Sequence, residues 1–101
     1  TLQVLAERFS RIGVPVFMAS RLVAALPPRT VGHRGRHLKL ILQSADSPQQ
    51  RLEAIGFGMG DRLEEVRRMK EMDVVFTLVQ NTFRGRTSLN MHIRAIRPSA
   101  D

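Results

Sequence analysis

Cationic and aromatic side chains that could hold a polyanion gather in two loops of this sequence and on the strands beside them. Arginine forks around phosphate oxygens, and an exposed aromatic ring can stack on a nucleobase. The residues of this kind, which we interpret as a candidate nucleic-acid site, are Arg29, Arg34, Arg36, His37, Lys39, Phe83, Arg84, Arg86, His92 and Arg94. Two alternatives stay open: the charged residues could form an ordinary solvated surface, and Phe83 could fold back onto the protein.

No group of side chains has the spacing of a catalytic or metal centre. His33, His37 and His92 have no metal-ligand spacing with one another or with the acids, and the chain has no cysteine. The acids of residues 61–65 fit a helix cap and a solvated helix face better than an acid–base pair. We therefore expect no catalytic residue, no metal and no other cofactor in this segment.

The charge of the chain favours an anionic partner. Its 101 residues carry a formal charge of +7, the pI is near 11.6, and every cation except Lys39 and Lys70 is an arginine. This balance favours nucleic acid ahead of a membrane surface. No apolar run approaches the roughly 20 residues of a membrane span, no signal peptide opens the chain, and the lack of cysteine suits a reducing compartment. We expect a cytoplasmic protein without membrane contact, and a start at Thr1 indicates a segment of a longer protein.

The sequence pattern predicts that the elements that position these side chains are mainly strands. In residues 37–42, Leu38, Leu40 and Leu42 fall on one side of an extended chain, while His37 and Lys39 fall on the other. One face can therefore enter a core while the other carries cations outward.

Two further strands are expected around this one. Residues 14–26 fit a long bent strand, although a helix over Met18–Leu26 fits as well. Residues 51–57 form a strand whose core face is ambiguous. Ile55 and Phe57 are favoured to face the core because their side chains are the larger ones, whereas Ala54 and Gly56 would leave room for a closely approaching ligand or neighbour. Phe17 and Phe76 are likewise expected to be core residues.

A helix and two more strands follow. Asp61 is expected to cap a helix of about three turns, together with Glu64, and an apolar stripe from Met59 to Met69 is expected to face the core. Residues 72–79 alternate as a strand with Val74, Phe76 and Leu78 on one side. In the last strand, residues 88–97, the side chains expected to face inward are Leu89, Met91, Ile93 and Ala95.

Two loops carry the arginines. Residues 27–36 are expected to form a flexible basic arm because of their Pro and Gly content, and residues 81–87 a hairpin loop in which Gly85 takes a positive φ. Residues 1–13 are interpreted as a linker or the end of a preceding helix, 14–98 as the folded domain and 99–101 as a tail.

The order of these elements is strand, strand, strand, helix, strand, strand. It is the order of the OB-fold, a five-stranded Greek-key barrel of the all-β class with one helix. OB-folds bind oligonucleotides across their second and third strands and with the loops that join strands 1–2 and 4–5. In this sequence those two loops are the basic segments 27–36 and 81–87.

Four motifs, by their order and spacing, resemble the C-terminal OB domain of the RecJ family. The members of this family are single-strand-specific DNA exonucleases of the DHH phosphoesterase superfamily. The resemblance covers about Phe9 to Ser99. The motifs are His37-Leu38-Lys39-Leu40, Ala54-Ile55-Gly56-Phe57-Gly58, Gly85-Arg86-Thr87-Ser88-Leu89 and Ile96-Arg97-Pro98. Ile12–Phe17 departs from the usual Gly-Asn-Pro-x-Pro-x-Phe entry segment, and Phe83 stands where many members carry tryptophan.

The resemblance implies a function for the parent protein and for this segment. The parent would be a 5′–3′ single-stranded-DNA exonuclease in DNA recombination and repair, hydrolysing phosphodiester bonds with Mg²⁺ or Mn²⁺ in an upstream DHH core. This segment would bind single-stranded DNA and position it for that core. The alternative is a protein-docking module that holds the nuclease domains together or recruits a single-strand-binding protein.

Overall fold

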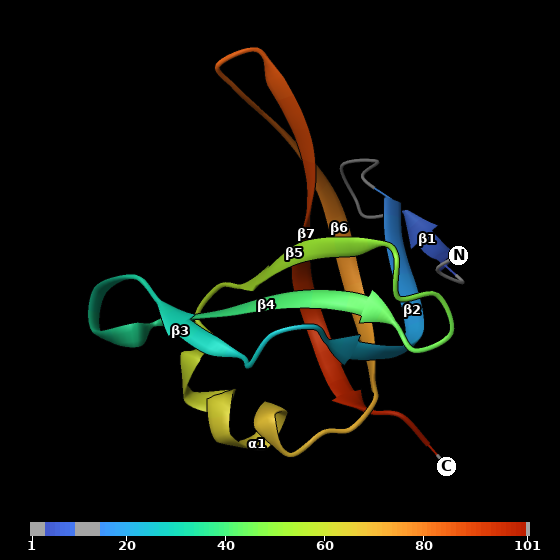
Figure 1. Ribbon diagram of the computed structural model, residues 1–101, viewed down its shortest axis with the longest axis vertical. Coiled ribbons are helices and arrows are strands. Elements are labelled where there is room, and N and C mark those ends of the chain that lie inside the picture. Colours follow the sequence, from blue (N-terminus) through green and yellow to red (C-terminus); the bar gives the residue numbers. More distant parts are fainter. Residues whose placement is uncertain (1–3, 10–14, 101) are drawn as a thin grey trace.

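A computed structural model describes residues 4–9 and 15–100, which form seven strands and a short helix (Figure 1). The strands are β1 (Val4–Phe9), β2 (Pro15–Ala24), β3 (Arg29–Val31), β4 (His37–Ser44), β5 (Arg51–Gly56), β6 (Met72–Phe83) and β7 (Arg86–Pro98). The remaining elements are two 3₁₀ turns, η1 (His33–Gly35) and η2 (Gly60–Arg62), and the helix α1 (Leu63–Arg67). Neither the helix nor the turns in these described ranges are long and apolar enough to span a membrane.

Five of the strands close into a barrel. The sheet order is β1-β2-β6-β7-β5-β4-β3, and a further pairing of β2 with β4 joins the sheet to itself. β5 and β7 run parallel, whereas the other neighbouring strands are antiparallel. Three barrel strands precede α1 and two follow it, so the expected OB-fold and its strand order are confirmed. β1 and β3 extend the sheet at its two edges.

The beginning of the chain differs from the sequence-based interpretation. Residues 4–9 are not the end of a helix but form β1, which pairs with the first half of β2. The helix alternative for Met18–Leu26 is also wrong, because β2 is the long bent strand. Residues 10–14, which include part of the entry segment Ile12–Phe17, lie outside the described residues.

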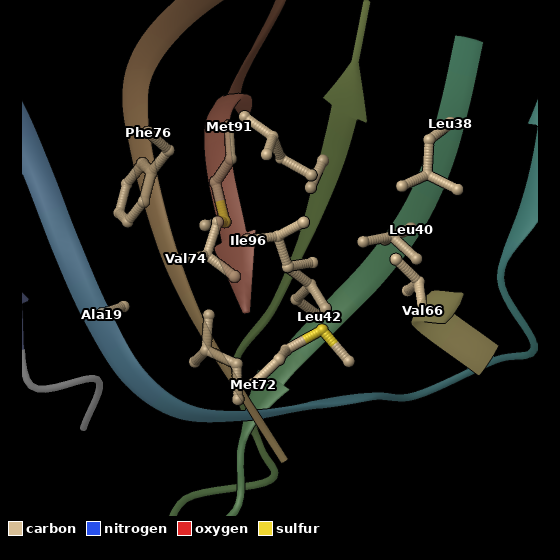
Figure 2. Close-up of a cluster of buried hydrophobic side chains, with 13 residues drawn as sticks. Ala19, Leu38, Leu40, Leu42, Val66, Met72, Val74, Phe76, Met91 and Ile96 are labelled. Atoms are coloured by element: carbon tan, nitrogen blue, oxygen red, sulfur yellow. The ribbon is translucent and has the colours of Figure 1, made fainter. Parts of the chain in front are cut away.

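The core lies between the barrel strands and α1 (Figure 2). On β4 every second side chain is buried, so the expected inward face of Leu38, Leu40 and Leu42 is confirmed. Val66 of α1 is also buried, and Met59, Leu63 and Met69 pack against the core as the apolar stripe predicts. Other strands fill the barrel with Ala19, Leu22, Ala54, Met72, Val74, Phe76, Met91, Ile93 and Ile96.

The helix is shorter than expected and is not capped by Asp61. α1 has five residues, and Asp61 lies within the preceding turn η2, where no side-chain cap is made. Arg62 explains this start, because its guanidinium donates to the carbonyl oxygen of Ile96 at 3.0 Å and also binds Glu65. A contact with β7, distant in sequence, therefore fixes where the helix begins.

The two faces of β5 are the reverse of the expected ones. Ala54 and Gly56 are buried, whereas Phe57, just after the strand, is 57% exposed. The register with β4 places Ala54 opposite Leu40 and Gly56 opposite Leu38, so the small residues share the inward face of the leucines. The side chain of Met59 fills the space over Gly56, where an added Cβ would lie 2.7 Å from its sulfur atom.

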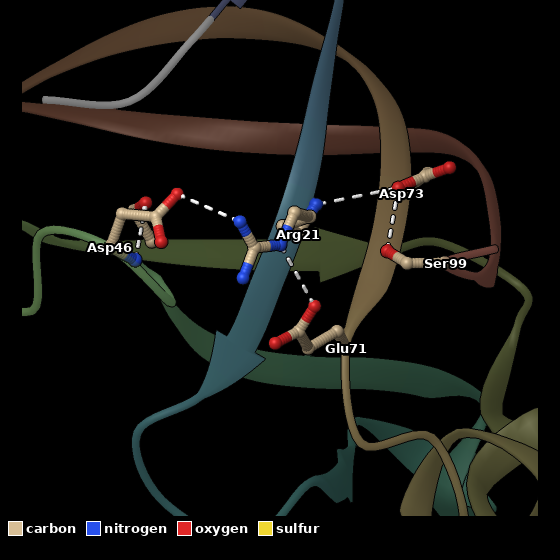
Figure 3. Close-up of polar contacts among 6 residues, drawn as sticks. Arg21, Asp46, Glu71, Asp73 and Ser99 are labelled. Carbon is tan, nitrogen blue, oxygen red and sulfur yellow. Dashed lines mark hydrogen bonds and ion pairs between the residues drawn. The ribbon is translucent and has the colours of Figure 1, made fainter. Parts of the chain in front are cut away.

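A sharp corner at Arg21, whose polar contacts are shown in Figure 3, bends β2 around the barrel. Arg21 has a φ of 57°, and the pairing of β2 with β6 shifts between Ala19 and Leu22. The Arg21 guanidinium contacts Glu71 at 3.1 Å and Asp46 at 3.2 Å, and its backbone N–H donates to Asp73 at 3.3 Å. These bonds hold a left-handed backbone conformation that is unfavourable for a residue with a Cβ.

A β-bulge changes the inward face of β7. Val75 pairs with Ala95 and Phe76 with Ile93, so Arg94 has no partner residue on β6. Ala95, which alternation alone places inward, is therefore exposed, and Ile96 is buried in its place. Leu89 is 49% exposed because β6 and β7 continue beyond the barrel as a two-stranded ribbon (Figure 1).

Asp73 makes the corner sensitive to acid. The hydrogen bond from Ser99 Oγ (2.6 Å), with smaller effects of the Arg21 N–H and the Arg97 guanidinium, holds the pKa of Asp73 below its ordinary value, against the opposing effect of burial. A carboxyl with a lowered pKa in the folded state stabilises the fold above its unfolded pKa, about 3.9. That stabilisation is lost as the pH falls through the lower folded value.

We expect Asp73→Asn to be about 1–3 kcal/mol less stable than the wild type at pH 7, because hydrogen bonds to a charged acceptor are lost. Below about pH 4 the difference should shrink, since the wild type alone loses this contribution. Urea unfolding at a series of pH values measures both effects. Asp61→Asn removes the same charge at an exposed position and is the matched control for the change of net charge. A pH-independent deficit for Asp73→Asn would contradict the role of this carboxylate.

Candidate nucleic-acid interface

The outward faces of β3, β4, β5 and β7 form one continuous surface. Cross-strand pairing places Arg29 beside Lys39, Lys39 beside Ile55, and Ile55 beside His92. Residues paired in this way present their side chains on the same face of a sheet. The register therefore brings residues from four strands into one row across the second and third strands of the barrel, the face that OB-folds use for oligonucleotides.

An exposed phenylalanine lies at the end of this surface. The Phe57 ring is 57% exposed and lies between two imidazoles, with ring centroids 5.2 Å from His37 and 5.1 Å from His92. Both contacts are edge-on, at 73° and 76°, so neither imidazole is stacked in parallel on the ring as a base would be. The backbone N–H of Gly58 donates to His37 Nδ1 at 3.0 Å and fixes that imidazole.

Sequence reasoning assigned Phe57 to the core, and this assignment is wrong. The alternative noted for the sequence is the correct one, because small residues at Ala54 and Gly56 suit a face covered closely by another element. Side-chain size favoured the opposite face. His37 and His92, by contrast, lie on the outward face as predicted, and the structure brings them together around Phe57.

Lys39 lies on the predicted face but is paired with an acid. Its Nζ is 3.3 Å from Glu53 Oε2, and Asn90 Nδ2 donates to the same oxygen at 3.4 Å. The Lys39 side chain is 20% exposed, so its charge is partly compensated before any phosphate approaches. The positive charge of this surface therefore comes from its margins, where Arg29 and Arg94 are exposed.

The basic segment 27–36 is held in place and is not the flexible arm expected from its sequence. β3 pairs with β4, and the N–H of Gly60 donates to the carbonyl oxygen of Arg36 at 2.9 Å. A Cβ on Gly60 would overlap the carbonyl oxygen of Gly35, so only glycine permits this close contact. The exposed arginines of this segment, together with neighbouring residues, line a shallow hollow formed by Thr30, His33, Arg34, Gly35, Arg36, Gly58, Gly60 and Asp61.

The second basic loop is a tight turn at the tip of the β6–β7 ribbon. Arg84 and Gly85 have φ values of 53° and 77°, as in a two-residue type I′ hairpin turn, so the positive φ expected for Gly85 is confirmed. The loop is shorter than the predicted 81–87 because pairing continues to Phe83 and Arg86. The Phe83 ring is 72% exposed, with the Arg84 guanidinium 5.3 Å from its centre, so Phe83 does not fold back onto the barrel.

The ribbon continues the face that carries Phe57. His92 pairs with Thr77, Asn90 with Val79, and Arg86 with Phe83, in one unbroken register. Steps of two residues keep the side chains on one face, so Phe83 and Arg86 lie on the same face of the ribbon as His92. The six residue steps from His92 to Arg86 span about 20 Å. The predicted site residues thus form a row rather than a cluster. Arg34 and Arg36 belong to the segment between β3 and β4, and Arg84 and Arg86 lie at the turn that joins β6 and β7 at the far end of the ribbon (Figure 1).

This combination defines an OB-fold domain of the nucleic-acid-binding kind: a closed five-stranded barrel with an exposed aromatic ring on its binding face and basic segments on both sides. The family model described as the RecJ OB domain matches residues 12–95. The chain therefore belongs to the RecJ OB domain family, and it is a nucleic-acid-binding module of RecJ-like proteins. No curated protein matches the chain.

If a base stacks on Phe57, Phe57→Ala should lower the affinity for oligo-dT by roughly tenfold or more, because a stacked base contributes about 1–3 kcal/mol. The slope of log K against log salt should not change, since no charge is removed. The melting temperature should also change little, because the ring is exposed. Fluorescence anisotropy at several salt concentrations and a thermal melt measure these quantities.

Two conservative variants separate stacking from general apolar contact. Phe57→Tyr keeps the ring face and should bind like the wild type. Phe57→Leu keeps apolar bulk without a ring face and should bind as weakly as Phe57→Ala. Wild-type affinity in Phe57→Leu would contradict the stacking role.

Proposed function

We propose that this chain is the single-stranded-DNA-binding module of a RecJ-like 5′–3′ single-strand-specific DNA exonuclease that acts in recombination and repair. The observation that carries the proposal is the exposed Phe57 ring, fixed between His37 and His92 on the face that OB-folds use for oligonucleotides. An apolar ring held open to solvent by ordered neighbours suits a flat ligand. Single-stranded nucleic acid offers such a ligand in each of its bases.

The proposed path of the strand follows the row of site residues. One end lies at Arg34 and Arg36, the middle passes over Phe57, and the other end runs along the ribbon toward Phe83 and Arg86. Arginines at both ends supply charge for the phosphates, while the two phenylalanines supply stacking surfaces. Phosphate contacts carry no sequence information, so this part of the binding tolerates many sequences.

In this proposal the chain binds and orients the strand and does not cleave it. Hydrolysis belongs to an upstream DHH core of the same parent protein, which the family resemblance implies to use Mg²⁺ or Mn²⁺. The module holds the single strand so that its end reaches that core, and the parent protein acts in the cytoplasm. In this proposal the arginines contact phosphates and the two phenylalanines contact bases, while His37 and His92 hold the Phe57 ring in place.

A second candidate function is protein docking, and the other face of the ribbon favours it. Leu78 is 36% and Leu89 49% exposed, and their strand positions are diagonal neighbours on the face opposite Phe83. Such an apolar pair could contact the catalytic domains of the parent or a single-strand-binding protein. The two functions use opposite faces of one ribbon, so variants can separate them.

The test removes the two cations at the ribbon tip. Arg84→Gln combined with Arg86→Gln should flatten log K against log salt by roughly one unit, because each neutralised phosphate contributes about 0.7 on a single strand. The loss of affinity should be similar for oligo-dT and oligo-dC. As a control, Arg67→Gln with Arg68→Gln removes the same charge from α1 and the residue after it, away from the ribbon (Figure 1), and should leave the slope nearly unchanged.

Equal slopes for the tip variant and the wild type would contradict DNA contact at the ribbon. If neither the tip variant nor Phe57→Ala alters DNA binding, the docking function replaces the proposed one. In that case Leu78→Ser with Leu89→Ser should abolish association with the purified catalytic domains while leaving the oligonucleotide affinity unchanged.

A further inference from the structure

An acidic residue lies in the middle of the proposed DNA-binding face. Glu53 lies on the outward side of β5, paired with Ile41 of β4 on one side and with Asn90 of β7 on the other. Its side chain is 53% exposed. A carboxylate at this position repels phosphates and weakens the binding that the surrounding arginines favour. Its position on this face therefore calls for a ligand group that a carboxylate binds well.

The contacts of Glu53 leave hydrogen-bond acceptors free on this face. Lys39 Nζ and Asn90 Nδ2 both contact Glu53 Oε2, at 3.3 and 3.4 Å. Within the described residues, no hydrogen bond occupies Glu53 Oε1 or Asn90 Oδ1. A carboxylate oxygen and an amide oxygen are acceptors only. The pair thus offers two free acceptor atoms on neighbouring strands, and the ammonium group of Lys39 holds the carboxylate of Glu53.

A platform for bases lies next to these acceptors. Glu53, Ile55 and Phe57 follow one another at two-residue intervals, and the outward face of β5 carries Glu53 and Ile55 in turn. Neighbouring side chains on one face of a strand are about 6.7 Å apart. If one base stacks on Phe57, the next base along β5 lies over the half-buried Ile55, and its edge reaches Glu53.

We propose that Glu53, together with Asn90, reads the edge of this second base and favours the N4 amine of cytosine or the N6 amine of adenine over the O4 carbonyl of thymine. This inference rests on the proposed function and names the ligand of the same site. The amine of cytosine or adenine donates to an acceptor, whereas thymine presents its O4 acceptor at the corresponding position. Two acceptors facing thymine O4 repel it, while an amine makes a charge-assisted hydrogen bond.

Lys39 is a positioning residue in this arrangement. Its contact with Oε2 orients the carboxylate and compensates its charge beside the phosphates. The resulting preference acts at one nucleotide of the bound strand. The module is therefore a general single-strand binder with one position that discriminates among bases.

The test compares oligo-dC, oligo-dT and oligo-dU of equal length at one salt concentration. Oligo-dU carries O4 in place of the cytosine amine and lacks the thymine methyl group. It therefore separates the effect of the amine on affinity from the effect of the methyl group. Wild-type protein should bind oligo-dC about fivefold more tightly than either of the other two, as expected for one exposed charge-assisted hydrogen bond. Glu53→Gln should bring the three affinities within about twofold, because glutamine can donate to O4 through its amide NH₂.

Glu64→Gln is the matched control. Glu64 lies on α1, pairs with Arg67 at 2.8 Å and is exposed, so the variant makes the same charge change away from the face. All three oligonucleotides should shift equally in this variant, and the preference for oligo-dC should persist. A thermal melt of Glu53→Gln confirms that the variant is folded.

The outcomes distinguish this inference from the proposed function. Equal wild-type binding of oligo-dC, oligo-dT and oligo-dU overturns the inference and leaves the proposed function standing. A preference for oligo-dC that survives Glu53→Gln also overturns it, because another group then reads the amine. Failure of wild-type protein to bind any of the three overturns the proposed function and the inference together.

Discussion

The closed barrel depends on the corner at Arg21. Before the corner, β2 pairs with β1 and β6. After it, β2 pairs with Met72 of β6 and with β4, so this one residue lets a single strand join both ends of the barrel. The left-handed conformation of Arg21 costs on the order of 1–3 kcal/mol. Contacts with Asp46, Glu71 and Asp73 bring the loop after β4 and the start of β6 to the same point and offset this cost.

The binding face follows from this closure. In the closed barrel β4 pairs with β2 as well as with β5, and the register of β4 and β5 determines which side chains face outward. The same register that buries Leu38 and Leu40 places His37 and Lys39 outside, and it carries Ile55 and His92 into the same row. The imidazoles that hold Phe57 are thus positioned by the hydrophobic core beneath them.

The sequence predicted features that depend on local pattern. The alternation of Leu38, Leu40 and Leu42, the apolar stripe from Met59 to Met69 and the turn at Gly85 all depend on neighbouring residues, and each was correct. The order of the strands and the helix was then sufficient to predict the OB-fold. The prediction of the core face of β5 was wrong because Ala54 and Gly56 are small, so hydrophobicity alone favoured the side that carries Phe57.

Other features depend on residues far apart in the sequence and carry no local signal. The contact of Arg62 with Ile96 sets the start of α1, and the bulge opposite Val75 and Phe76 turns Ala95 outward. The pairing of Lys39 with Glu53 likewise requires the register of β4 and β5. Among the candidate site residues, Glu53 could not be identified from local pattern, because a single acid in a strand is most often a solvated side chain.

The β6–β7 ribbon has a consequence for the dynamics of the domain. All side chains from residue 80 to residue 89 are exposed, and two strands without a core beneath them are only marginally stable. The backbone hydrogen bonds of the ribbon can therefore open while the barrel stays folded, and its amide protons should exchange with solvent far faster than those of β4. A ligand on the ribbon must supply the free energy that orders it, which lowers affinity but lets one short segment adapt to strands of different shape.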